Sequence, residues 1–363
     1  MTRKVFVHVG APKTGTTYLQ DRLYHNRSAL AAHGIDYPVG LKLDMFGAAL
    51  DLVDRPWGGL RQEVHGEWDA LVRRVSRHSD TVVLSHEILA GAKTPQIERA
   101  MQDLTVAGAE VHVIYTARDL GRQIPAEWQE QIKHNGRTRF RRYVRQVRKA
   151  RQDHAKRWFW RVQGLPDVLT RWGRNLPPEH VHLITVPQPG APKDTLWLRF
   201  CEVVGIDPQW APVDSQRRNP SLGGAEAAVL RRLNTILKDE DFGGADYRML
   251  VREVIAHRTL AQRARTTRIT LPPDAHPWAD SVASRWIEWI EGSRIDVTGD
   301  LAELRPAEPG PEPWANPDKP RNKDVADAAI EALAAVVLEA GRRPDPRFSL
   351  RAKMARAVRR ARA

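Results

Sequence analysis

A short segment near the start of the sequence combines two glycines, a lysine and a pair of threonines in a pattern that can bind an anion. An apolar run over residues 4–9 leads into it, and a helical pattern with Tyr18, Leu19 and Leu23 follows it. Glycine permits loop conformations closed to other residues, so the loop amides can point inward at an anion. A helix N-terminus and a lysine add positive charge. The segment is Gly10-Ala11-Pro12-Lys13-Thr14-Gly15-Thr16-Thr17.

The glycine spacing of this segment matches the phosphate loop G-x-x-x-x-G-K-[ST], but the position of its lysine does not. Gly10 and Gly15 occupy the glycine positions, whereas the lysine lies inside the loop at Lys13 and Thr16 stands in its usual place. An ordinary strand-to-helix turn rich in glycine and threonine is the plainer interpretation. We favour anion binding, because the lysine, the glycines and the threonines coincide with a strand-loop-helix context.

Charged residues also follow two other apolar runs. His86 and Glu87 come directly after residues 81–85, and Arg118-Asp119 comes after residues 111–116. Ligands bind beyond the carboxyl ends of the strands in an open parallel sheet, so we expect these side chains to converge with Lys13. Local roles compete with this interpretation. Glu87 could cap the following helix while His86 packs locally, and Arg118 could form a structural salt bridge with Asp119.

The elements that must position these residues follow from four short apolar runs, which predict strands at residues 4–9, 81–85, 111–116 and 181–186. Helical patterns separate the runs, which implies crossover connections and a parallel sheet. The pattern is helical from about residue 223 to 291. The sequence therefore predicts an α/β fold, a parallel sheet flanked by helices, with a helical C-terminal part.

Composition narrows the class of protein. The chain has 363 residues, of which 42% are hydrophobic and 28% charged, as expected of a soluble globular protein. No run reaches the roughly 18 apolar residues of a membrane helix. Cys201 is the only cysteine, so no internal disulfide can form, and we expect a cytoplasmic protein.

The net charge of +13 is concentrated in two patches. Residues 137–161 hold eleven lysines and arginines against one acid, and residues 347–363 hold seven and no acid. Such patches attract polyanions, but no nucleic-acid motif accompanies them, so we expect solvated faces and no nucleic-acid binding. His180 and His182 alternate along one predicted strand without a matching set of ligands, and we expect no metal.

The P-K-x-G-T-T-x-L loop and the Arg118-Asp119 pair resemble the sulfotransferases that use 3′-phosphoadenosine 5′-phosphosulfate, bacterial and actinobacterial members in particular. The resemblance covers about residues 4–300 and implies a P-loop fold. We expect a sulfotransferase-like domain at residues 1–304, a proline-rich linker at 305–324, and a C-terminal helix with a basic tail at 325–363.

The resemblance implies a role for each site residue. Residues 10–17 would bind the 5′-phosphosulfate, with Lys13 stabilising charge on the bridging oxygen, and Arg118 would bind the 3′-phosphate. Glu87, slightly preferred, or His86 would take the proton of the acceptor. The chemistry of the family requires no metal.

One position departs from the family pattern. The family places a serine eight residues after the arginine, where this chain has Ala126. The residues that could replace the serine are Arg122, Gln123 and Gln129.

The expected activity is transfer of a sulfuryl group to a hydroxyl or amine of a small molecule or glycan. Two alternatives stay open. A P-loop kinase or NTPase would bind ATP or GTP with Mg²⁺, although the position of Lys13 counts against it. A non-catalytic protein would bind a nucleotide or another polyanion through residues 137–161, with affinity that falls steeply as salt rises.

Overall fold

The computed structural model describes residues 3–39, 45–54, 64–77, 80–106, 108–150, 158–217, 220–240 and 242–342. The second basic patch, residues 347–363, and residues 151–157 of the first basic patch lie outside the described residues. Contacts between residues group the chain into two compact units. Unit 1 comprises Met1–Glu130, Thr138–Asn219 and Thr270–Trp314, and unit 2 comprises Gln131–Arg137, Pro220–Ile269 and Ala315–Ala363. The chain thus enters unit 2 three times, and the boundaries expected at residues 304 and 324 stay predictions about domain organisation.

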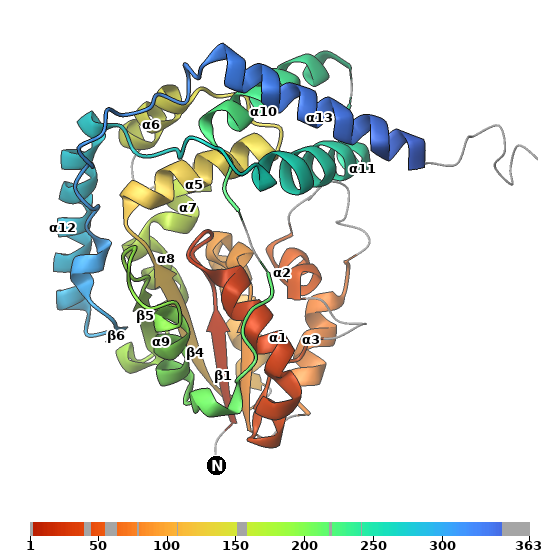
Figure 1. Cartoon of the computed structure of the whole chain (residues 1–363). Coiled ribbons are helices and arrows are strands. Elements are labelled where there is room, and N and C mark those ends of the chain that lie inside the picture. Colours follow the sequence, from red (N-terminus) through yellow and green to blue (C-terminus); the bar gives the residue numbers. More distant parts are fainter. Residues whose placement is uncertain are drawn as a thin grey trace, which may run out of the picture. The chain divides into compact units, whose positions relative to one another are not determined.

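Unit 1 is built on a sheet that has six parallel strands among the described residues (Figure 1). Its order is β2-β3-β1-β4-β5-β6. The strands are β1 (Arg3–His8), β2 (Ile35–Asp36), β3 (Thr81–Ser85), β4 (Ala109–Ala117), β5 (Val181–Thr185) and β6 (Asp296–Thr298). β1, β3, β4 and β5 confirm the four predicted strands, with ends shifted by a residue or two. β2 and β6 were not predicted.

The central strands are buried along their whole apolar length. Val5 pairs in register with Val82 on one side and Val111 on the other, and all three are at most 4% exposed. Parallel strands are covered on both faces, so they read as continuous apolar runs in the sequence. This burial explains why the runs in β1, β3, β4 and β5 identify the strands.

Helices cover the sheet of unit 1. Their bounds are α1 (Thr16–Ala32), α2 (Met45–Val53), α3 (Glu67–Val75), α4 (Thr94–Val106), α5 (Leu120–Lys133, whose last residues belong to unit 2), α6 (Phe140–Lys149), α7 (Trp158–Gln163), α8 (Leu165–Gly173), α9 (Thr195–Val204) and α12 (His276–Ser293). α4 and α8 contact β4 and each other, and α9 contacts β5 and β6. The predicted fold class, a parallel sheet flanked by helices with a helical C-terminal part, is confirmed.

Short 3₁₀-helices lie between these elements. Two of them matter for the sites described below, η1 (Glu87–Gly91) after β3 and η2 (Pro178–His180) before β5. No helix within the described ranges is long and apolar enough to cross a membrane.

Unit 2 is helical. It contains α10 (Gly224–Leu237), the single-turn α11 (Gly244–Asp246), a π-helix (Tyr247–Thr259) and α13 (Asn322–Arg342). Ala225 and Ala228 of α10 form a buried cluster with Val325 of α13. The predicted C-terminal helix is present, and it begins at Asn322 rather than at Val325.

Candidate active site

Three strand ends meet at the carboxyl edge of the sheet in unit 1. β1 lies between β3 and β4. The chain goes from β1 to β2 and β3 on one side and then crosses to β4 on the other, and ligands bind at such a reversal of strand order in open α/β sheets. The residues after each strand stay in contact. A methyl group built on Gly10 would lie 3.2 Å from the Cα of Glu87, and the amide of Ala11 donates to the Thr116 carbonyl over 2.9 Å. The ends of β1, β3 and β4 therefore lie together at Gly10, Glu87 and Thr116.

His8, the last residue of β1, joins the three strands below this edge. Its Nδ1 lies 2.8 Å from Ser85 Oγ at the end of β3, and its Nε2 lies 3.3 Å from Thr116 Oγ1 of β4. Burial lowers the pKa of His8 to about 4. The imidazole is therefore neutral at physiological pH and acts as a hydrogen-bonding support under the loop.

The loop after β1 has the backbone of an anion-binding turn. Gly10, Lys13 and Gly15 have φ values of 111°, 66° and 93°, in the region that favours glycine. The amides of Lys13, Gly15, Thr16 and Thr17 donate no hydrogen bond to any described residue. α1 begins at Thr16, so its positive dipole end adds to these free amides. The arrangement can hold a phosphate or sulfate group.

The threonines of the loop divide between support and binding. Thr14 Oγ1 donates to the Ala11 carbonyl over 2.5 Å and also lies 2.5 Å from Thr116 Oγ1. Thr16 Oγ1 donates to the same carbonyl over 3.3 Å. These two hydroxyls hold the shape of the loop. The hydroxyl of Thr17 is half-buried and has no hydrogen-bond partner within the described ranges, so it is available to a ligand.

Lys13 is held by a carboxylate from α5. Its Nζ lies 2.5 Å from Glu130 Oε2, and both side chains are about one-fifth exposed, at 23% and 21%. One turn earlier on α5, Glu127 is buried and accepts a hydrogen bond of 3.1 Å from Gln163. Burial raises the pKa of Glu127 to about 7, although the charge of Lys13 acts in the opposite direction. Because Lys13 is already paired with Glu130, an incoming anion would compete with this carboxylate for the ammonium group.

The two residues after β3 have different environments. His86 Nδ1 accepts a hydrogen bond of 3.2 Å from the Ile88 amide, so His86 caps η1. Glu87 does not provide the cap. Its carboxylate is 30% exposed, lies 4.0 Å from His86 Nδ1, and accepts a long contact of 3.5 Å from the Gln20 amide. Glu87 is thus the better placed of the two to meet a solvent-borne group.

Arg118 is connected to the loop through a glutamine. Its Nε donates to Gln123 Oε1 over 2.9 Å, and Gln123 Nε2 donates to the Pro12 carbonyl over 2.5 Å. Asp119 instead caps α5 through the Arg122 amide and pairs with the Arg122 side chain. The guanidinium of Arg118 is half-buried at the edge of the same loop.

Sequence reasoning missed the polar residues that approach the loop from distant elements. Gln163 of α7 donates to the Pro12 carbonyl over 2.9 Å, and Glu127 and Glu130 come from α5. Among the residues weighed as replacements for the missing serine, Gln123 binds Arg118, and Arg122 Nη1 donates to the Pro187 carbonyl over 2.8 Å. The only sequence signal for Glu127 and Glu130 was their spacing of three residues, which places both on one face of a helix.

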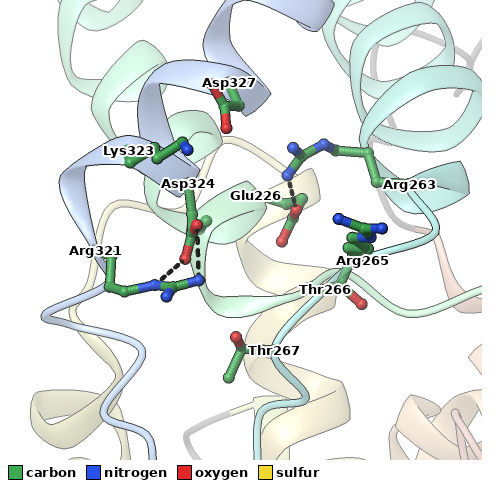
Figure 2. A pocket seen from close by; sticks show the side chains of 10 residues that line it. Glu226, Arg263, Arg265, Thr266, Thr267, Arg321, Lys323, Asp324 and Asp327 are labelled. Atoms are coloured by element: carbon green, nitrogen blue, oxygen red, sulfur yellow. Dashed lines mark hydrogen bonds and ion pairs between the residues drawn. The ribbon is translucent and has the colours of Figure 1, made fainter.

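Unit 2 contains a separate polar pocket of about 540 Å³ (Figure 2). Arg263 pairs with the buried Glu226, and Arg321 forms two hydrogen bonds of 2.8 and 3.0 Å with Asp324. The pocket is also lined by Arg265 and Lys323. None of the residues predicted for the site lines it.

Comparison with known proteins finds two similar solved structures. No protein-family model and no curated protein matches the sequence. A sulfotransferase from Alicyclobacillus acidocaldarius is 16% identical, with a TM-score of 0.36 over 69% of this chain and 96% of that chain. A sulfotransferase domain from the curacin biosynthetic pathway is 13% identical, with a TM-score of 0.38 over 79% of this chain and 98% of that chain. With TM-scores this low, the assignment of function rests on the residues of the site itself.

Proposed function

We propose that the chain is a sulfotransferase that moves a sulfuryl group from 3′-phosphoadenosine 5′-phosphosulfate to a hydroxyl or amine. One observation carries the proposal. A loop with unpaired amides and an internal lysine lies in contact with the backbone of a half-exposed glutamate, at the carboxyl edge of a parallel sheet. Sulfuryl transfer needs a site that binds the anionic donor and, beside it, a base that takes the proton of the acceptor hydroxyl or amine. The loop and the carboxylate supply these two groups.

The residues that would hold the donor fit its charges. The amides of residues 13–17 and the ammonium of Lys13 would bind the 5′-phosphosulfate, and Arg118 would bind the 3′-phosphate. The chemistry is positioning plus electrostatic stabilisation, as in phosphoryl transfer. The donor supplies the activated sulfuryl group.

Glu87 would act as the base in the transfer, so that every bond, electron pair and proton is accounted for. The oxygen or nitrogen of the acceptor forms a bond to sulfur, and the bond from sulfur to the bridging oxygen breaks. The electron pair stays on the 5′-phosphate, where Lys13 neutralises it, and the acceptor proton moves to the Glu87 carboxylate. His86 would support Glu87, since its Nδ1 is already engaged by the Ile88 amide.

Turnover of the donor tests this proposal. Release of 3′-phosphoadenosine 5′-phosphate is measured with panels of phenols, alcohols, amines and sugars as acceptors, in wild type, Glu87→Gln and the exposed control Glu98→Gln. We expect acceptor-dependent release that falls by about 10²- to 10⁴-fold in Glu87→Gln and is unchanged in the control. Acceptor-dependent release that survives Glu87→Gln would refute the role of Glu87. Turnover of ATP with Mg²⁺ instead would favour the kinase alternative.

A further inference from the structure

A cluster of histidines and carboxylates lies toward the amino ends of the strands in unit 1, away from the loop. Glu110 and His112 are two residues apart on β4 and therefore share a face of the sheet. Their register partners on β1 are Lys4 and Phe6. His180 of η2 completes a group of three, whose potential ligand atoms all lie within 4.8 Å of one another.

A chain of contacts crosses the strands behind this group. Asp296 Oδ2 of β6 lies 2.7 Å from His182 Nδ1 of β5, and His182 Nε2 lies 2.9 Å from His112 Nδ1. The chain ends where His112 Nε2 meets Glu110 Oε1 over 2.9 Å. Three contacts of hydrogen-bond length therefore join two carboxylates through two imidazoles.

This row of three contacts lacks one proton when both imidazoles are neutral. Each contact needs one proton between its two atoms, the carboxylates at both ends only accept, and a neutral imidazole carries a single proton. Two neutral rings thus supply two protons for three contacts.

A metal ion between His112 Nε2 and Glu110 would satisfy the whole chain. The two protons would then occupy the two remaining contacts, on His112 Nδ1 and His182 Nδ1. Such an outer chain, from the second ring nitrogen of a ligating histidine to a carboxylate, is the usual support of a metal-binding imidazole. Asp296 would thereby fix the tautomers of both rings.

His180 supplies a third ligand from the segment that enters β5. Its Nε2 lies 3.8 Å from Glu110 Oε1, and its ring stacks on His112 with centroids 4.2 Å apart. Ligand atoms of a tetrahedral zinc ion lie about 3.3 Å apart. Glu110 Oε1 lies 2.9 Å from His112 Nε2 and 3.8 Å from His180 Nε2, and the potential ligand atoms of all three residues lie within 4.8 Å of one another, so small side-chain shifts would complete the site. The side chains of His180 and Glu110 are 21% and 31% exposed, which leaves room for a water at a fourth position.

We propose that Glu110, His112 and His180 bind a zinc ion, with His182 and Asp296 orienting the His112 ring. Two imidazoles and one carboxylate are a ligand set that zinc uses with an open fourth position. Lys4 is the competing cation, because its Nζ lies 3.6 Å from Glu110 Oε1, but its half-exposed side chain can turn into solvent. The ion would tie β4 to the segment that enters β5. This site does not depend on the proposed sulfotransferase activity.

Zinc binding by the full chain, without a histidine tag, tests the proposal. The protein is stripped with a chelator and dialysed, then titrated with Zn²⁺, and with Co²⁺ for its visible absorption spectrum. The variants are Glu110→Gln and His180→Ala, whose side chains are half-exposed, and the control is His65→Ala, which removes an exposed imidazole of unit 1. Circular dichroism confirms that each variant is folded before titration.

We expect one zinc ion per chain in wild type and in His65→Ala, a higher unfolding temperature with zinc, and a four-coordinate Co²⁺ spectrum. Each of the two ligand variants should bind zinc at least about tenfold more weakly and lose the thermal shift. No stoichiometric zinc in wild type would overturn the proposal. So would affinity that is unchanged in both ligand variants, or lowered equally by His65→Ala, which would indicate surface binding only.

Discussion

Lys13 already forms an ion pair with Glu130 before any ligand binds. The ammonium that would meet a phosphosulfate lies 2.5 Å from Glu130, in a partly buried position. An anion must share or displace this carboxylate. Glu130 therefore lowers the affinity of the loop for an anion while it holds Lys13 in the loop.

Removing the charge of Glu130 should strengthen anion binding. Glu130→Gln leaves a polar side chain of the same size, but Lys13 no longer has a competing carboxylate. We expect the Kd of 3′-phosphoadenosine 5′-phosphate to fall by about fivefold, equivalent to about 1 kcal/mol for a pair of this exposure. Calorimetric titration measures it, with Glu98→Gln on the exposed face of α4 as the control. Weaker binding in Glu130→Gln would mean that the glutamate helps to hold the ligand.

Glu127 gives a prediction about pH. Burial raises its pKa from 4.5 to about 7, so the folded state favours the protonated carboxyl. The stability that this proton contributes is complete below pH 4.5 and is lost as pH rises through 7. Glu127→Gln imitates the protonated form and can still accept from Gln163. The variant should match wild type at pH 4.5 and exceed it by up to about 3 kcal/mol at pH 8.

Urea unfolding of Glu127→Gln and wild type across this range measures the difference. Glu98→Gln, at an exposed position, should follow wild type at every pH. A stability difference for Glu127→Gln that does not change with pH would show that the carboxyl is not protonated in the folded state.

The positions of His86, Glu87 and Arg118 could be predicted because each comes just after an apolar run, and that of Lys13 because it lies in the glycine loop that follows one. Their supports could not. Glu130 lies more than a hundred residues from Lys13, and no local pattern indicates which helix face meets the loop. The local alternative, in which Glu87 caps the helix and His86 packs locally, also differs from the structure, since His86 accepts the η1 amide.

At the scale of the element, the junction of the loop and α1 depends on Gly15. Its φ of 93° disfavours any other residue, and a methyl group there would lie 2.5 Å from Leu196 Cδ2 of α9. The turn therefore favours glycine, and an added methyl group would also have to displace the end of the Leu196 side chain.

Gly15→Ala should destabilise the fold and abolish binding of the bisphosphate. Gly190→Ala is the matched control, because Gly190 has a φ of 98° but no atom within 4 Å of the added methyl group. Backbone strain should cost both variants about 2 kcal/mol, and displacing the Leu196 methyl group should cost Gly15→Ala up to about 1 kcal/mol more. Denaturant unfolding compares them. Equal losses would contradict the close contact with Leu196.

Length and burial decided which elements the sequence could reveal. β1, β3, β4 and β5 are buried runs of five or more residues and were predicted. β2 and β6 have two and three residues, too few for a pattern of alternation or burial. The helical region after residue 223 was predicted as a whole, but its π-helix, Tyr247–Thr259, has no signature that distinguishes it from an α-helix.

The positive charge is distributed unevenly over the whole molecule. Anion binding through the basic patch at residues 137–161 can therefore be distinguished from anion binding in the loop at Lys13. Arg142 and Arg145 lie exposed on α6, within the basic patch at residues 137–161. A polyanion bound through that patch would depend on them and would dissociate as salt rises. A nucleotide bound in the loop would depend on Lys13.

Replacing both arginines should therefore spare the loop. We expect Arg142→Ala with Arg145→Ala to leave the equilibrium Kd for 3′-phosphoadenosine 5′-phosphate within about twofold, because both charges are exposed and screened by salt. Titration at two salt concentrations checks this. A large loss of affinity in the double variant would favour the non-catalytic polyanion-binding alternative.

Each of the two units is made of three separate stretches of the chain. The sequence indicated successive segments, since prolines cluster at residues 305–324. In the structure, residues 131–137, 220–269 and 315–363 group together, and Val325 of α13 packs on α10. Such long-range grouping leaves no mark on local composition.

The most direct test of the account is calorimetric titration of 3′-phosphoadenosine 5′-phosphate into wild type, Lys13→Ala and Arg118→Ala, with ATP–Mg²⁺ as the comparison ligand. Lys93→Ala and Arg77→Ala, both exposed, serve as charge-matched controls. We expect the bisphosphate to bind wild type and both controls more tightly than ATP–Mg²⁺ does, and both site variants to lose this binding. A preference for ATP–Mg²⁺, or bisphosphate binding that survives Lys13→Ala, would contradict it.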